Sequence, residues 1–198
     1  MRDADDARYG ELLRALTLGG CPGWIKEAQR AQLELLSDRH RLAIASPLGT
    51  TFQHLTFYAT AFYGPAFLEG VTRSFVDQPP EDASFSLKVA RAAKAWIEAT
   101  GRRELAMLFE YEQCLSDPGE PYTGEDREAL QLAERLPDGF SLVSFDCDIL
   151  GFAGLLERLR ARSAPPEMVV QYQPAPRRQR LAFYREGEAL RVQELSAG

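Results

Sequence analysis

The chain has 198 residues, of which 45% are apolar and 26% charged, and its net charge is -6. This composition is typical of a globular protein with one or two cores, and the acidic balance opposes non-specific binding to nucleic-acid phosphates. The longest apolar runs are too short to span a bilayer and the first residues lack an apolar signal segment, so we expect a cytoplasmic protein.

Apolar residues at helical spacing dominate the chain as far as Arg162. Gly19 with Gly20 should end the first helix, Ser46 with Pro47 should start another, and Gly64 with Pro65 should interrupt it. The pattern predicts helices over about 5–18, 24–36, 47–63, 65–76, 84–100, 105–117, 123–136 and 148–162. Residues 37–40 either continue the second of these helices or break it.

Polar residues mark the ends of several of these helices. Ser84 and Asp148 are expected N-caps, and Thr123 with Asp126 resembles a capping box. Between the last two predicted helices, the alternation of residues 140–146 predicts a single strand.

The pattern changes in the tail, from Glu167 to Leu195. Short β-prone runs at 168–172, 181–184 and 190–192, with a turn at 186–188, predict a small antiparallel sheet. The intervening run 174–180 reads as a mobile connection. The fold class is therefore α+β and predominantly α, with a helical body at 1–163 and a C-terminal β appendage at 164–198.

A small sheet leaves an open edge, and the backbone groups of such an edge can pair with an extended peptide. The tail also carries five arginines against four glutamates on an otherwise acidic chain. The dense arginine cluster is a solvated loop, a docking point for an acidic peptide beside the edge, or, as a third alternative, a nucleic-acid contact. The peptide-binding candidates are Met168, Val170, Tyr172, Arg177, Arg178 and Arg180.

The two histidines, His40 and His54, fall on separate predicted helices, which argues against a metal centre made by this chain alone. His54 lies in a very aromatic segment. It is either packed within a helix interface or, with Phe57 and Tyr58, part of a partner interface.

Other reactive residue types give no catalytic arrangement. Cys147 lies between Asp146 and Asp148, whose negative charge disfavours the thiolate. Glu110 and Glu112 are two positions apart on a predicted helix, so their carboxylates should point to different faces. We find no phosphate-binding glycine loop and no nucleophile elbow.

The stretch from Phe57 to Gln113 resembles a known family. It combines an aromatic helix, the run 66–71, a proline break, the helix with Ala95-Trp96-Ile97, and the run 104–112. This order is similar to a helical family once labelled DNA-binding domains. Its members include the small partner subunits of TIM-barrel multinuclear non-haem iron enzymes in methanobactin and 3-thiaglutamate biosynthesis.

The resemblance implies a non-catalytic subunit that forms a heterodimer with the iron enzyme, with the helical body 1–163 for partner docking and the appendage 164–198 for peptide binding. It would recruit the leader of a ribosomally made precursor peptide for cysteine modification, partly by strand addition, while this chain holds no cofactor and the partner holds the iron. Two alternatives stay open: a DNA-binding or regulatory module, and a stand-alone enzyme that uses Cys147 or the region of Glu110 and Glu112.

Overall fold

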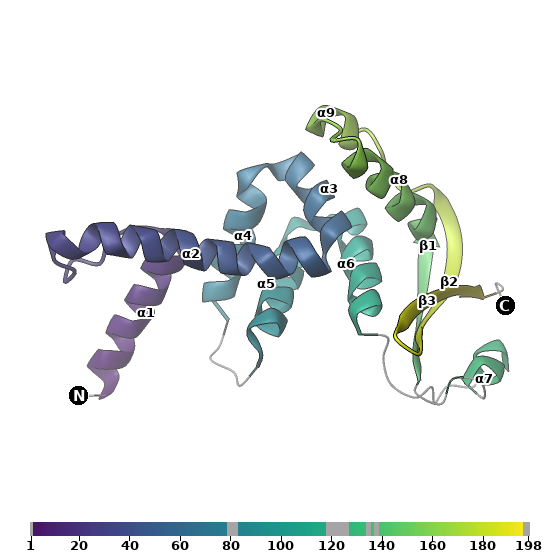
Figure 1. Ribbon diagram of the computed structural model, residues 1–198, viewed down its shortest axis with the longest axis horizontal. Helices are drawn as coiled ribbons and strands as arrows, with labels where there is room; N and C mark the ends of the chain where they lie inside the picture. The colour runs from purple at the N-terminus through teal and green to yellow at the C-terminus, as the bar shows by residue number, and fades with distance from the viewer. Residues whose placement is uncertain (1, 79–82, 118–126, 134–135, 137–138, 196–198) are drawn as a thin grey trace. The chain divides into compact units, whose positions relative to one another are not determined.

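The computed structural model describes residues 2–78, 83–117, 127–133, 136 and 139–195 (Figure 1). Helices predominate in these ranges and are accompanied by one three-stranded antiparallel sheet, which confirms the predicted α+β class. The chain forms two compact units, residues 1–50 with 63–101 and residues 51–62 with 102–198. None of the described helices is both long and apolar enough to cross a membrane.

This division differs from the predicted one at 163/164, because the sheet takes its first strand from residues 140–147. The β appendage is therefore not a separate C-terminal piece. Its strands share a unit with the helices that precede and follow the first strand.

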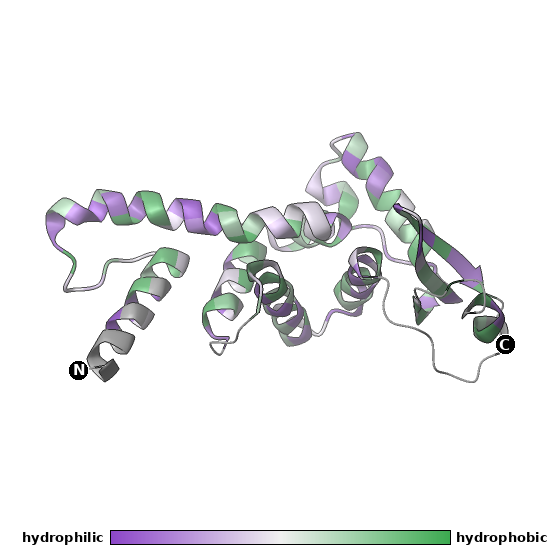
Figure 2. Cartoon of the chain, turned by 60° about the horizontal axis from the view of Figure 1, so that its bottom comes forward, coloured by the Kyte–Doolittle hydropathy of each residue, from purple (hydrophilic) through white to green (hydrophobic). Residues whose placement is uncertain are grey.

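The first unit is helical in its described part. Its elements are α1 (Arg2–Leu18), most of α2 (Glu27–Thr51), α4 (Pro65–Val76) and α5 (Phe85–Thr100). The helix α4 packs against both α1 and α5. Gly70 of α4 faces the indole of Trp96, and a Cβ at this position would collide with that ring. Hydrophilic and hydrophobic positions alternate along these helices, as expected for one buried face (Figure 2).

The predicted ends of α5 are confirmed. Ser84 accepts a hydrogen bond from the backbone N–H of Leu87, and Gly101 ends the helix in the left-handed conformation. The predicted helix start at Ser46 and Pro47 is wrong, because Pro47 lies inside α2. Ile44 and Leu48 on either side of it are buried, and this packing outweighs the single backbone hydrogen bond that a proline removes.

The second unit contains the sheet and the helices that cover it. Strand β2 (Pro176–Glu186) lies between β1 (Phe140–Cys147) and β3 (Ala189–Leu195), and both pairings are antiparallel. The helices of this unit are α3 (Gln53–Tyr63), α6 (Arg103–Ser116), α7 (Arg127–Ala133), α8 (Ile149–Ala161) and α9 (Pro166–Val169).

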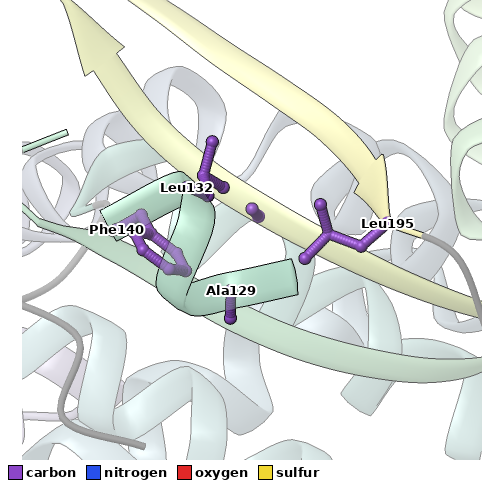
Figure 3. Close-up of a cluster of buried hydrophobic side chains, with 5 residues drawn as sticks. Ala129, Leu132, Phe140 and Leu195 are labelled. Carbon is purple, nitrogen blue, oxygen red and sulfur yellow. The ribbon is translucent and has the colours of Figure 1, made fainter. Parts of the chain in front are cut away.

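Helices cover both faces of the sheet. On one face, α7 contributes Ala129 and Leu132 to a buried cluster with Phe140, Ala182 and Leu195 of the strands, and all of these but Ala182 are labelled in Figure 3. On the other face, the Phe183 ring contacts Tyr111 of α6, and the Gln179 side chain accepts a hydrogen bond from the first turn of α8. Both faces are closed, so only the strand edges remain for a further strand.

The tail differs from the prediction at two places. The predicted strand at 168–172 is wrong, since Pro165 and Pro166 start the short helix α9 and the Pro165 carbonyl accepts from the Met168 and Val169 amides. The predicted mobile connection at 174–180 is also wrong from Pro176 onward, because those residues pair with β1.

The remaining strand predictions are confirmed. The runs 140–146, 181–184 and 190–192 lie in β1, β2 and β3. Gly187 has a positive φ of 63° in the predicted turn, and Asp148 caps α8. The capping box predicted at Thr123 and Asp126 lies outside the described residues.

Candidate functional site

Strand β3 forms one edge of the sheet and is joined to β2 by a tight hairpin loop. Glu186 pairs with Ala189 across a two-residue loop, and Gly187 in the first loop position has the positive φ of a type II′ turn. The residues that flank such a loop form a hydrogen-bonded pair, and the pattern then alternates along the strand. The backbone N–H and C=O groups of Leu190, Val192 and Glu194 therefore point away from β2.

Strand β1 forms the opposite edge of the sheet, and several of its side chains contact α6. Arg103 forms an ion pair with Asp146, the Met107 sulfur lies 3.3 Å from the Cys147 sulfur, and Cys114 forms a hydrogen bond with Ser141. These contacts run along the length of β1. Of the two edge strands, we take β3 as the candidate for pairing with an extended peptide, because its hairpin with β2 defines which of its backbone groups point outward.

A concave surface lies between α8 and α9, and we call it the α8–α9 groove. Its volume is about 380 Å³, and its apolar walls come from Leu155, Leu159, Pro165, Met168 and Tyr172. Met168 and Tyr172 are 43% and 38% exposed, which is high for such large apolar side chains. The structure thus brings two of the predicted peptide-binding residues together, although on a helix and turn instead of a strand.

Two arginines, Arg158 and Arg162, complete the α8–α9 groove. Within the described residues neither forms an ion pair, whereas Arg160 on the same helix is bound to Glu157. Our sequence reasoning missed both, although their spacing of four residues, in register with Leu155 and Leu159, places all four on one face of α8. An apolar groove beside two unneutralised guanidinium groups suits a segment with an apolar side chain next to a carboxylate.

Tyr58 supports this groove from inside the unit. Its hydroxyl donates a hydrogen bond to the Tyr172 carbonyl at 3.0 Å, and its ring packs against Phe152 of α8. Burial, with Glu104 contributing, raises the pKa of Tyr58 to about 12, so the hydroxyl stays protonated and can donate. Tyr58 is fully buried, so a partner cannot contact it as the prediction of a partner interface required.

The three predicted arginines of the tail do not form one patch. Strand alternation places Arg177 on the opposite face of β2 from Arg178 and Arg180. Arg177 is neutralised by Glu194 at 2.8 Å and lies 3.5 Å from Asp148. Arg178 is exposed and Arg180 is half-buried. Val170 is half-buried just after α9.

The buried carboxylate of Glu112 caps α3 from another helix. Its oxygens accept hydrogen bonds from the backbone N–H groups of His54 and Leu55 at 2.8 and 3.0 Å, the positions that an N-cap side chain usually satisfies. Phe52, just before α3, has no capping side chain. Glu112 also accepts from His54 Nδ1 at 2.8 Å. The sequence signal for the burial of Glu112 is its spacing, which places this glutamate on the same helical face as Leu105, Leu108 and Phe109.

The remaining predicted interface residues have structural partners. His54 Nε2 lies 3.5 Å from Glu157, and its ring packs against Tyr111, while Phe57 is half-buried. His40 lies in the other unit, packed against Phe75 and Phe85. The described residues hold no cluster of three or more histidine, cysteine or acidic side chains that could bind a metal ion.

The cysteines differ in their access to solvent. Burial raises the pKa of the Cys147 thiol, with Asp148 adding to the rise against the opposing charge of Arg103. Burial and Glu110 raise the pKa of Cys114 to about 11. Cys21 is exposed. These surroundings oppose formation of a thiolate at Cys147 or Cys114 near neutral pH.

Alkylation should therefore be selective. We expect iodoacetamide near neutral pH to modify Cys21, and to modify Cys114 and Cys147 at rates at least about tenfold lower, since only the thiolate reacts. Peptide mass spectrometry after timed quenching measures the three rates. Rapid modification of Cys147 in the folded chain would instead support the enzyme alternative.

Comparison with protein-family models, curated proteins and solved structures gave no match.

Proposed function

We propose that the chain is a non-catalytic partner subunit that binds the leader of a ribosomally made precursor peptide and presents it to an iron-dependent peptide-modifying enzyme. The observation that carries this proposal is the edge of β3, whose outward backbone groups can pair with an extended strand. The iron-enzyme partner comes from the resemblance of residues 57–113 to small subunits of this kind.

Two features of the described residues agree with this role. Glu112 accepts hydrogen bonds from the backbone and the imidazole of His54 at the start of α3. Glu110 is exposed whereas Glu112 is buried, so the two carboxylates do not converge on a substrate. The pairing of Arg177 with Glu194 weakens the one basic segment on which the alternative of DNA binding relied.

Calorimetric titration of the leader peptide into the full chain tests the proposal. We expect binding with one peptide per chain in the absence of the enzyme subunit. Binding that occurs only after the enzyme is added would place the peptide site on the enzyme. Salt-sensitive binding of duplex DNA without binding of the leader would favour the DNA-binding alternative.

The α8–α9 groove should hold a segment of the same leader that carries an apolar side chain beside a carboxylate. Reversing one charge, Arg162→Glu, should weaken leader binding about fivefold to tenfold, because a favourable charge pair becomes a repulsive one. The matched control is Arg160→Glu on the same helix, which changes the net charge equally but does not line the groove. Equal effects of the two variants would remove the groove from the binding site and leave the β3 edge untouched.

A further inference from the structure

The long helix α2 exposes an apolar face to solvent. Its buried side chains share one side of the helix: Leu33, Ser37, Ile44 and Leu48. Leu35 and Leu42 point to the opposite side and are 54% and 69% exposed, the two highest values among the large apolar side chains that the structure describes. Neighbouring exposed leucines of this kind indicate an interaction surface.

The apolar face continues along the helix in both directions. With about 3.6 residues per turn, positions seven apart return to nearly the same side of a helix. Small exposed residues therefore extend the line of the two leucines: Ala28, Ala31, Ser46 and Gly49. We call these six residues the α2 stripe. Its small side chains let a second helix approach closely, and its leucines supply the apolar contact.

Opposite charges flank the α2 stripe at one height. Asp38 and Arg39 lie midway between Leu35 and Leu42, and each is about 50° from the line of the leucines, in opposite directions around the helix. Both side chains are exposed, and neither forms an ion pair within the described part of the chain. The α2 stripe thus has an acidic flank and a basic flank.

These flanks complement each other when two copies of the chain pair in parallel. A two-fold axis along the paired helices brings the acidic flank of each copy to the basic flank of the other. Asp38 then lies beside Arg39 of the second copy on both sides, and each leucine meets its own counterpart. An antiparallel pair centred on the same leucines would place Asp38 beside Asp38 and Arg39 beside Arg39, which like-charge repulsion disfavours.

We propose that the α2 stripe is the interface of a parallel homodimer, in which Leu35 and Leu42 pack against their counterparts and two ion pairs between Asp38 and Arg39 close the flanks. All of these residues belong to the first unit, so the interface uses neither β3 nor the α8–α9 groove. The dimer goes beyond the proposed function, and each of its two chains keeps its own edge for a leader peptide.

Sedimentation velocity of the full chain over a range of concentrations tests the association. We expect a monomer–dimer equilibrium with a Kd on the order of 10 µM, because a single pair of helices buries a small interface. Leu42→Glu should raise this Kd at least about tenfold, since it places a carboxylate in the centre of the contact. Leu42 is exposed in the single chain, so thermal unfolding of this variant should match that of the unchanged chain.

The matched control is Leu36→Glu. Leu36 is also an exposed leucine of α2, at 44%, but it points about 100° away from the α2 stripe. This variant changes the net charge equally and should dimerise as the unchanged chain does. Both variants should bind the leader peptide normally, which separates the dimer from the proposed function.

Charge reversal tests the orientation of the two helices. Asp38→Arg and Arg39→Asp should each raise the dimer Kd about tenfold, because each replaces two favourable pairs with repulsive ones. A chain with both changes should regain the affinity of the unchanged chain, since the exchange restores both pairs in the parallel arrangement.

Several results would overturn the proposal. A chain that stays monomeric at about 200 µM has no such dimer. Equal weakening by Leu42→Glu and Leu36→Glu would place the interface elsewhere, and a double reversal that dimerises no better than the single ones would exclude the parallel pair. A monomeric chain whose Leu42→Glu variant fails to bind the iron-enzyme subunit would make the α2 stripe the docking face for that enzyme instead.

Discussion

Val192→Pro should lower the affinity for the leader peptide by at least about tenfold, because proline removes one backbone donor and its ring keeps an added strand from close approach. The N–H of Val192 points away from β2, so the β2–β3 pairing loses no hydrogen bond. Prolines are tolerated on edge strands for this reason. Calorimetric titration of the leader into the folded variant measures the effect.

The matched control for this change is Val192→Ala, which shortens the same side chain and keeps the N–H. Its leader affinity should fall by no more than about threefold, since strand addition draws its affinity mainly from backbone hydrogen bonds. Thermal unfolding of both variants establishes that they are folded. A folded Val192→Pro chain that binds the leader normally would show that β3 is not the peptide-binding edge.

Glu112→Ala should lower the free energy of unfolding by about 3 kcal/mol, because two amides at the start of α3 and the His54 imidazole lose a charged acceptor inside the protein. Glu112→Gln keeps one carbonyl acceptor and should cost about half as much. Denaturation in urea, followed by circular dichroism, measures both changes.

Glu110→Ala is the control for the buried glutamate. It lies on the same helix but is exposed, so its effect should stay within about 0.5 kcal/mol. Equal losses for the Glu110→Ala and Glu112→Ala variants would show that the cap on α3 contributes little to stability.

Local signals in the sequence predicted much of the fold. Ser84 and Asp148 were recognised as N-caps because each precedes an apolar helical pattern, and their side chains accept the expected hydrogen bonds. The hairpin of β2 and β3 was predicted from a glycine turn between β-prone runs, and Gly187 adopts the positive φ such a turn requires. These features depend on residues that are neighbours along the chain.

The errors arose where tertiary packing or the preceding prolines outweigh the local pattern. Pro47 remains inside α2 because Ile44 and Leu48 are buried, a packing effect that a local start signal does not contain. The β-prone run at 168–172 follows two prolines that start a helix, and the Tyr58 hydroxyl then binds the Tyr172 carbonyl. Local β propensity was overridden in this segment.

The candidate site could be predicted only in part for the same reason. Met168 and Tyr172 were chosen from the tail alone, whereas the α8–α9 groove also needs Arg158 and Arg162 from the preceding helix. Arg177 is predicted from the sequence as a peptide-binding residue, but the pairing of β2 and β3 brings Glu194 beside it.

Amide hydrogen exchange of β3, measured by NMR with and without the leader peptide, tests strand addition most directly. The amides of Leu190, Val192 and Glu194 should exchange much more slowly in the complex, while those of Arg191 and Gln193, already paired with β2, should change little. If the leader peptide saturates the chain without slowing amide exchange at Leu190, Val192 and Glu194, the claim that it adds a strand to β3 is contradicted.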